Sequence, residues 1–357
     1  MDYIEQLSFI VERSSAFAGK HVRISVIVNP VAGGFTIPSR VKANKIALEE
    51  AVQSVSYRKP AARSCSCAVF RTESAGHASR LARAVFDSIL EDAASDVLHL
   101  VVTAGGDGTS LDVQAEMAKM VLEEGRGELS DRVCLLRLPF GTGNDGSDGR
   151  TLSESFTRLV GDSRFEFRPA VVVRPHNCSA SPWYAFNIAS LGLDAFVTHM
   201  TNHVKRIVPG DVYKIWVDAA CLFYNRLYPL GSMRVNAYSA DGTQVSSYAE
   251  PLLLQVMGVS GYRTYGSNQR ILPDERNVCA ARDMSLLRKL SLKKYVKEGT
   301  HAGFPEMIMY TAAKLVINYD KKILVQMDGE SHLLDAASFP LVMELSKPFM
   351  QVLVPQM

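Results

Sequence analysis

Hydrophobic and polar positions alternate in two different ways along this chain. Up to about residue 160, short apolar runs that predict buried strands are each followed by a longer stretch with helical spacing. The predicted strands are residues 22–28, 68–70, 97–103 and 133–138. The predicted helices are residues 42–54, 75–91, 111–124 and 153–160. Alternation of this kind is typical of a three-layer α/β arrangement, in which helices cover both faces of a parallel sheet.

Beyond residue 162 the pattern changes to strand-like runs with fewer helices. The predicted strands are residues 165–173, 183–190, 233–239, 251–260, 314–317, 323–327, 341–345 and 351–355. The predicted helices are residues 195–205, 212–226 and 285–297. This pattern predicts a mainly antiparallel, β-rich second domain with inserted helices. We therefore place a first domain at residues 1–162 and a second domain at residues 163–337.

Composition, charge and cysteine usage narrow the class of protein. The 357 residues suffice for two domains, and 47% hydrophobic with 21% charged residues is ordinary for a globular protein. The net charge of +2 gives no sign of a nucleic-acid partner, and no uncharged apolar run reaches the ~20 residues that span a bilayer. The six cysteines form no C-x-x-C pair that would indicate a zinc site. We therefore expect a cytoplasmic protein with reduced thiols.

Three of the predicted strands run directly into glycine-rich turns. The turns are Asn29-Pro30-Val31-Ala32-Gly33-Gly34, Gly105-Gly106-Asp107-Gly108-Thr109 and Gly141-Thr142-Gly143-Asn144-Asp145. Glycines let backbone N–H groups approach an anion without a side chain in the way, and a following helix N-terminus adds partial positive charge. Because ligands bind at the carboxyl ends of the strands in such sheets, we expect the three turns to converge. The pattern predicts a polyphosphate site, with Asp107 as an oxygen ligand for Mg²⁺.

Several widespread nucleotide-binding signatures are absent. The chain has no G-x-x-x-x-G-K-[ST], no G-x-G-x-x-G after a strand, and no protein-kinase H-R-D or D-F-G. Together, the three turns resemble the diacylglycerol kinase catalytic family, which groups bacterial lipid kinases with sphingosine and ceramide kinases. G-G-D-G-T is shared with NAD kinases, whereas G-T-G-N-D is similar to the lipid-kinase branch. The resemblance extends to Thr72 with His77-Ala78, residues 191–195, Gly299-Thr300-His301 and Met327-Asp328-Gly329-Glu330.

The resemblance implies a two-domain fold that binds ATP between the domains, with the last strands, at residues 338–357, returning to the first domain. The residues that it implies for ATP binding are Asn29, Pro30, Gly33, Thr72, Gly105, Gly106, Gly108, Thr109, Gly141, Thr142, Gly143, Asn144 and Asp145. Asp107 would act on Mg²⁺ directly or through water. Phosphoryl transfer depends chiefly on positioning and on neutralising charge, which backbone amides and a metal ion supply.

A lipid hydroxyl that accepts a phosphoryl group also needs a general base. The resemblance points to Glu330, with Asp107 as the competing candidate and Asp328 as a residue that supports the metal or orients Glu330. The implied reaction transfers the γ-phosphoryl group of ATP to a primary hydroxyl of a lipid at a membrane surface. Diacylglycerol is the expected acceptor, and phosphatidic acid is then the product.

Other readings of these residues stay open. They are a sphingosine- or ceramide-type lipid kinase, a soluble NAD-kinase-like enzyme, and a non-catalytic nucleotide- or lipid-binding module. The basic residues within 288–297 suggest peripheral contact with the inner face of a membrane, although a solvated helix face explains them as well. The sequence leaves the oligomeric state open, and a homodimer is compatible with it.

Two segments depart from the family pattern. Residues 146–150, with the sequence GSDGR, follow the third turn in place of a Phe-Ala-Arg-like helix start. We therefore expect the next helix to begin differently. Residues 271–280 resemble the start of a loop that holds a structural Mg²⁺ in some bacterial members, but they lack its Asp-Gly. We do not expect a structural metal there.

Overall fold

The computed structural model describes residues 6–94, 96–141, 143–177, 181–205, 223–266 and 268–356. Most of the predicted helix at residues 212–226 lies outside the described residues, and so does Thr142 of the third turn. The chain forms two compact units. Residues 1–169 and 348–357 make up unit 1, and residues 170–347 make up unit 2.

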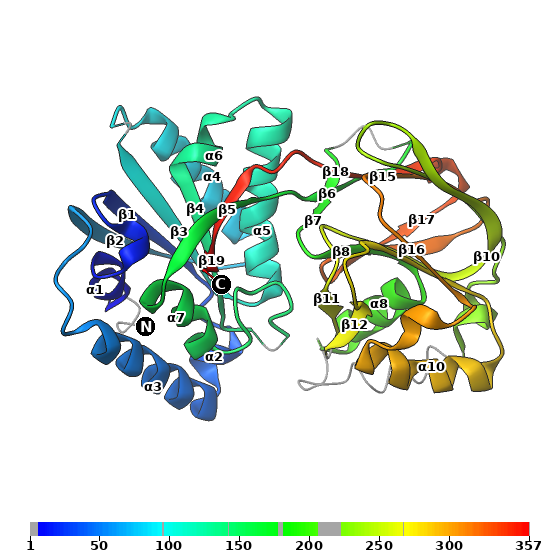
Figure 1. The fold of residues 1–357 in the computed structure, drawn as a ribbon, viewed down its shortest axis with the longest axis horizontal. Helices are drawn as coiled ribbons and strands as arrows, with labels where there is room; N and C mark the ends of the chain where they lie inside the picture. The colour runs from blue at the N-terminus through cyan, green and yellow to red at the C-terminus, as the bar shows by residue number, and fades with distance from the viewer. Residues whose placement is uncertain are drawn as a thin grey trace. The chain divides into compact units, whose positions relative to one another are not determined.

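Unit 1 is built on a six-stranded sheet with the order β2-β1-β3-β4-β19-β5 (Figure 1). Its strands are β1 (His21–Val28), β2 (Ser64–Arg71), β3 (Val97–Gly105), β4 (Val133–Pro139), β5 (Ser163–Arg168) and β19 (Met350–Pro355). All neighbours pair in parallel except β5, which runs antiparallel to β19. Every residue of the central strand β3 is buried, as expected for a parallel strand that is covered on both faces.

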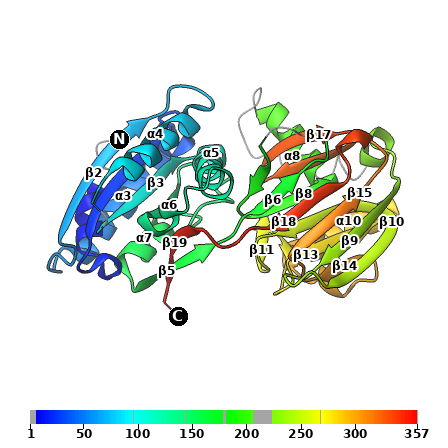
Figure 2. The ribbon, with the colours of Figure 1, turned by 90° about the horizontal axis from the view of Figure 1, so that it is seen from above.

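Two groups of helices cover this sheet (Figures 1 and 2). The first group is α1 (Leu7–Glu12), α3 (Pro38–Val55) and α7 (Leu152–Val160), which pack on one another. The second group is α4 (His77–Glu91), α5 (Asp107–Ala118) and α6 (Glu128–Arg132). A short helix, α2 (Gly33–Thr36), lies between β1 and α3, and a π-helical turn (Lys119–Glu123) extends α5.

The apolar spacing of the sequence explains why these helices pack as they do. In α4 the buried residues recur every three or four positions, so one stripe of the helix faces the sheet. In α3 the buried residues, such as Leu48 and Val55, join the core that β1 forms with Phe156 of α7. Alternating helix and strand patterns in the first part of the chain therefore predicted this unit correctly.

The units divide at different residues than the sequence suggested. The expected boundary at residue 162 separates β5 from unit 1, but β5 pairs with β19 in the sheet of unit 1. The predicted strand at residues 165–173 is in fact two strands, which belong to different sheets. Likewise β18 (Leu341–Leu345) pairs with strands of unit 2, so only the stretch from Pro348 returns to unit 1. Strand pairing, which local patterns do not encode, sets both boundaries.

Unit 2 contains an eleven-stranded sheet in which neighbouring strands pair antiparallel. Besides β18, its strands are β6 (Val171–Arg174), β7 (Trp183–Ala185), β8 (Ile188–Gly192), β9 (Ser232–Tyr238), β10 (Gln244–Gly258), β13 (Val278–Arg282), β14 (Met307–Tyr310), β15 (Lys314–Asn318), β16 (Ile323–Met327) and β17 (Glu330–Leu334). A separate two-stranded ribbon consists of β11 (Arg263–Tyr265) and β12 (Gln269–Leu272).

The helices of unit 2 pack on one part of this sheet. Among the described residues they include α8 (Leu193–Lys205) and α10 (Leu286–Glu298). Phe196 of α8 and Leu292 of α10 share a core with residues of β10, β13 and β16. The prediction of a parallel α/β unit followed by a mainly antiparallel unit with inserted helices is confirmed. Among the described helices, none has the length and apolar character needed to cross a membrane.

Candidate active site

The first glycine turn of unit 1 is held against the second. The backbone N–H of Asn29 donates to the carbonyl of Ala104 at 3.0 Å. The side-chain oxygen of Asn29 accepts from the N–H of Val31 at 3.2 Å, and its amide nitrogen lies 3.5 Å from Oγ1 of Thr109. Pro30 is half-buried, and Gly33 opens helix α2. Asn29 therefore stabilises its own turn and contacts the start of α5.

The second turn passes directly from β3 into α5. Gly105 is the last residue of β3, Gly106 precedes the helix, and Asp107 is its first residue. A Cβ on Gly105 would lie 2.6 Å from Oγ1 of Thr109, so only glycine fits there. Gly108 is exposed and Thr109 is buried. The N-terminus of a twelve-residue helix thus lies at the carboxyl end of the central strand, where it favours an anion.

The Asp107 carboxylate binds the third turn. Oδ2 accepts from the N–H of Asn144 at 2.9 Å, and Oδ1 accepts from the N–H of Gly146 at 3.1 Å. Gly143 lies so close that a Cβ there would be 2.6 Å from Oδ2. Asp107, on the second turn, therefore organises the backbone of the third turn.

The third turn is fixed by its own side chains and by close backbone contact. Asn144 has the left-handed φ of 62°, which places its side-chain oxygen 2.9 Å from the N–H of Gly141. A Cβ on Gly141 would lie 2.5 Å from Cα of Gly106, so the second and third turns touch through two glycines. Arg40 of α3 donates to the carbonyl of Gly141 at 2.6 Å. Asp145 is half-buried in the bend that follows.

Thr72 lies beside the first turn. It follows β2 directly, and its N–H donates to the carbonyl of Val28, the last residue of β1, at 2.9 Å. The next residue, Glu73, donates its N–H to Nδ1 of His77 at 3.1 Å, at the start of α4. The structure thus brings the described residues of all three turns, and Thr72, to the carboxyl ends of neighbouring strands.

A buried ion pair, which the sequence analysis did not identify, supports the third turn. Asp148 of the divergent segment is 5% exposed, and its carboxylate accepts from the guanidinium of Arg137 at 2.8 Å and from the Arg137 N–H at 2.7 Å. Burial disfavours the charged carboxylate, but Arg137 and the nearby Arg158 outweigh it and lower the pKa of Asp148. Arg137 also donates to Gln114 of α5 at 3.1 Å.

The same segment explains where the next helix begins. Helix α7 begins at Leu152, and its N-cap is Thr151, whose hydroxyl accepts from the N–H of Glu154 at 3.2 Å. Residues 146–150 thus form the connection that contains Asp148, instead of a first helical turn. Helix α7 therefore begins only after this connection.

In unit 2, the Asp-Gly of the fourth signature forms the tight turn between β16 and β17. The Asp328 carboxylate accepts from the backbone N–H groups of Phe186, Asn187 and Ile188 at distances of 2.5 to 3.1 Å. Both Asp328 and Gly329 have positive φ angles, of 46° and 104°. Three amide donors make Asp328 an anchor of the turn.

Glu330 follows this anchored turn as the first residue of β17, and it is exposed. The turn before it is held on both sides. The N–H of Gly329 donates to the side chain of Gln326 at 3.0 Å, and its carbonyl accepts from Asn202 of α8 at 2.6 Å. Gln326 is fully buried and donates to Ser190 at 2.8 Å and to Asp194 at 3.1 Å. A rigid hairpin therefore presents an exposed carboxyl group.

Residues 271–280 are braced by an ion pair. The Asp274 carboxylate accepts from the N–H and the guanidinium of Arg276, and these hydrogen bonds lower the pKa of Asp274. Within the described residues, no group of three or more His, Cys, Asp or Glu side chains is arranged to hold a metal ion.

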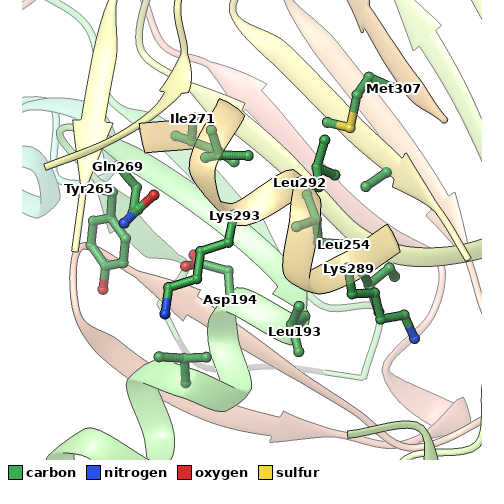
Figure 3. A pocket seen from close by; sticks show the side chains of 14 residues that line it. Leu193, Asp194, Leu254, Tyr265, Gln269, Ile271, Lys289, Leu292, Lys293 and Met307 are labelled. Atoms are coloured by element: carbon green, nitrogen blue, oxygen red, sulfur yellow. The ribbon is translucent and has the colours of Figure 1, made fainter. Parts of the chain in front are cut away.

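Unit 2 also contains an apolar pocket, which Figure 3 shows from close by. Aliphatic side chains of α8, β10 and α10 form most of its wall, among them Leu193, Leu254 and Leu292. Its polar lining residues are Asp194, Tyr265, Gln269, Lys289 and Lys293. An apolar cavity with a few polar groups at its rim is the usual form of a site for an amphipathic ligand.

Comparison with known proteins agrees with this geometry. Residues 23–158 match the family model of the diacylglycerol kinase catalytic domain. The matched residues include all three glycine turns. No curated protein sequence matches the chain at a significant level.

Solved structures share the fold of this chain. A candidate diacylglycerol kinase from Bacillus anthracis str. Sterne matches with a TM-score of 0.58 at 16% identity. A diacylglycerol kinase structure from the same organism matches with a TM-score of 0.55 at 14% identity. Each match covers 92% of this chain and 96% of the other. The family match supports a phosphotransferase, and the solved structures show the fold that this chain shares with them.

Within the matched residues, sequence reasoning found the residues of the turns and missed those behind them. Arg40, Arg137 and Asp148 carry no local motif, and only their contacts show that they hold the third turn. A signal for Asp148 was nevertheless present, since it lies in the segment that departs from the family pattern. In unit 2, Gln326 was adjacent to a recognised signature but had no apparent role without its partners.

Proposed function

We propose that this chain is an ATP- and Mg²⁺-dependent lipid kinase, which transfers the γ-phosphoryl group to a primary hydroxyl of a lipid. Diacylglycerol is the proposed acceptor. The observation that carries the lipid acceptor is the apolar pocket of unit 2, because a kinase for a small polar substrate such as NAD has no use for an aliphatic wall. The interlocked turns of unit 1 support the nucleotide donor.

The proposed donor residues are the turn residues that the sequence indicated. Backbone N–H groups near Gly33, Gly106 and Gly143 bind phosphate oxygens, and the N-terminus of α5 adds partial positive charge. Asp107 fits Mg²⁺ chemically, since it is a half-buried carboxylate at the start of that helix. Bound Mg²⁺ neutralises charge on the phosphates. Asn29, Thr72 and Asn144 hold the shape of the surrounding turns.

Glu330 is the proposed general base. The lipid hydroxyl loses its proton to the Glu330 carboxylate while its oxygen forms a bond to the γ-phosphorus. The bond between the γ-phosphorus and the β–γ bridging oxygen breaks, and ADP leaves. An exposed carboxylate on a rigid hairpin suits this role, because a base must be positioned and yet reachable. Asp107 remains the competing base. Asp328 orients the hairpin through its three amide contacts.

The proposed substrate also requires contact with a membrane. The basic stretch at residues 288–297 was the suggested contact, and it lies on α10. Two of its cations are engaged within the unit. Arg288 pairs with Glu306 at 2.8 Å, and Lys289 is buried and pairs with Asp283 at 3.0 Å. Lys294 and Lys297 of the same helix are exposed, and they are the residues that we propose for electrostatic attraction.

The direct test is to incubate the protein with γ-labelled ATP and a mixed lipid extract and to identify the labelled product. We expect a phosphorylated lipid, with phosphatidic acid as the main product, and no label in the Glu330→Gln variant. A labelled sphingoid or ceramide product would correct the acceptor. Phosphorylation of NAD without any lipid product, or ATP binding without consumption, would overturn the proposal.

A further inference from the structure

Helix α10 has two faces of different character. Lys289 and Leu292 are buried, and Val296 is half-buried. These three residues line the apolar pocket. Figure 3 shows Leu292 and Lys293 extending from this helix at the pocket. One face of α10 is therefore a wall of the proposed lipid site, which makes its opposite face a surface next to that site.

The opposite face begins with exposed leucines. Leu287 is 80% exposed and Leu290 is 40% exposed, and Leu286 beside them is 41% exposed. Leu287, Leu290, Lys294 and Lys297 follow one another at intervals of three or four residues, so they lie on the same side of the helix. Exposed leucines that gather at one end of a helix face indicate a binding surface.

The basic residues of α10 also differ between its two faces. Arg288 and Lys289 are neutralised by Glu306 and Asp283. Lys294 and Lys297 are exposed on the leucine face, and the pair that Lys294 makes with Glu298 is long, at 4.0 Å. An apolar stretch next to outward lysines is the pattern of a helix that lies in a membrane interface.

The size of the pocket favours a bilayer as the occupant of this face. The cavity volume is about 110 Å³, whereas pockets that enclose a whole ligand measure roughly 300–1,000 Å³. The pocket fits part of an acyl chain and leaves the remainder outside. The remainder stays out of water only if the pocket opens close to a lipid surface.

We propose that the outward face of α10 is a membrane-docking surface. Leu287 and Leu290, assisted by Leu286, insert at the boundary between head groups and acyl chains, and Lys294 and Lys297 bind anionic head groups. The proposal rests on the lipid-kinase function and deepens it, because it names how the enzyme reaches its substrate. It differs from a purely basic contact, since part of the binding is apolar and so survives high salt and zwitterionic lipid.

The experiment measures docking without any reaction. Wild-type protein is sedimented with phosphatidylcholine vesicles and with vesicles containing phosphatidylserine, in low and high salt and without ATP. The Leu287→Ser/Leu290→Ser variant is expected to lower the partition coefficient at least about tenfold on both vesicle types. The Lys294→Ser/Lys297→Ser variant is expected to lower it about thirtyfold on anionic vesicles in low salt. It is expected to leave binding to phosphatidylcholine unchanged.

Val245→Ser is the matched control, because Val245 is 45% exposed and lies on β10. It is expected to leave the partition coefficient unchanged. Unaltered thermal unfolding shows that each variant is folded, and phosphorylation of a lipid in detergent micelles reports the kinase separately. Equal vesicle binding of the leucine variant and wild type overturns the docking surface. If light scattering shows wild-type dimers that the leucine variant loses while vesicle binding stays, the face joins two copies and the proposal is wrong.

Lipid phosphorylation in micelles that persists in the leucine variant, together with lost vesicle binding, supports the surface and the function together. Wild-type protein that docks on vesicles but phosphorylates no lipid in any form contradicts the kinase proposal and leaves the docking surface standing. The two proposals therefore fail in different ways.

Discussion

The turns of unit 1 and the hairpin turn of unit 2 both combine glycine with aspartate, but they use the aspartate differently. Asp107 accepts two N–H groups from a turn that follows another strand of the same sheet. Asp328 accepts three N–H groups from residues 186–188, where they lead into β8. In unit 1 the carboxylate joins two loops that are both proposed to bind the nucleotide. In unit 2 it anchors the hairpin, and its neighbour Glu330 is the exposed group.

This difference shows that an aspartate in a Gly-Asp-Gly or Asp-Gly-Glu sequence is not by itself a ligand or a base. At the ends of parallel strands, several loops meet, so one carboxylate can organise the loops and still lie at the ligand. In the hairpin between β16 and β17, the Asp328 carboxylate instead anchors the turn to the segment that leads into β8. We therefore expect loss of Asp107 to disturb nucleotide binding and chemistry together, and loss of Asp328 to act through the fold.

The largest expected effect is on turnover, and it distinguishes the role of Glu330 from that of Asp107. Glu330→Gln should lower turnover about 10²–10⁴-fold, because it removes a general base, while nucleotide affinity stays close to that of wild type. Asp107→Asn should abolish turnover and also weaken nucleotide binding, since it alters the carboxylate that holds the third turn. Lipid phosphorylation and calorimetric titration with a non-hydrolysable ATP analogue measure the two properties. Near-normal turnover of either variant removes that residue from the mechanism.

The next effect concerns the buried support of the third turn. Asp148→Asn should lower the free energy of unfolding by about 3–5 kcal/mol at neutral pH, because it leaves the Arg137 guanidinium without its anionic partner. The folded-state pKa of Asp148 is lowered, so its contribution is present above the usual carboxyl pKa and is lost as the pH falls through the lowered value.

The difference in unfolding free energy between wild type and Asp148→Asn should therefore have its largest value at pH 7. It should become smaller below about pH 4. Denaturant unfolding at a series of pH values checks this. Exposed Asp96 provides a control, since Asp96→Asn should change stability little at any pH. A difference that stays constant from pH 7 to pH 3 contradicts the ion-pair explanation.

For the anchor of unit 2, we predict a loss of stability with no direct loss of nucleotide binding. Asp328→Ala leaves the N–H groups of Phe186, Asn187 and Ile188 without acceptors in a buried region, which costs about 3 kcal/mol. Thermal unfolding measures the loss, and titration with the ATP analogue checks that affinity is retained. If Asp328→Ala loses nucleotide affinity at unchanged stability, Asp328 belongs to the ligand site and the contrast with Asp107 is wrong.

The smallest effect tests the backbone contact between two turns. Gly141→Ala should destabilise the protein by about 1–3 kcal/mol and weaken nucleotide binding, because its Cβ would lie 2.5 Å from Cα of Gly106. Gly127→Ala is the matched control, since a Cβ there meets no atom within 4 Å. Chemical denaturation measures the stability of both variants, and nucleotide titration measures their affinity. Equal behaviour of the two variants would show that the turns do not need to touch.

Local sequence determined the elements of unit 1 and the residues of its turns. The hydrophobic spacing of α4 and the fully apolar β3 require a buried sheet whatever surrounds them. A Cβ at Gly141 would meet the backbone of Gly106, and a Cβ at Gly105 would meet the side chain of Thr109, so both positions favour glycine.

Tertiary structure alone decided which residues hold those turns and where the units divide. Asp148 and Arg137 are 11 residues apart and form a pair only because β4 and the following connection bring them together. The pairing of β5 with β19 joins the middle of the chain to residues near its end, so no local pattern marks that boundary. The same holds for Asp328, whose sequence signature indicates chemistry but whose carboxylate is taken by three distant amides. The sequence specifies these charged side chains. Long-range contacts decide what each of them does, and local periodicity does not contain those contacts.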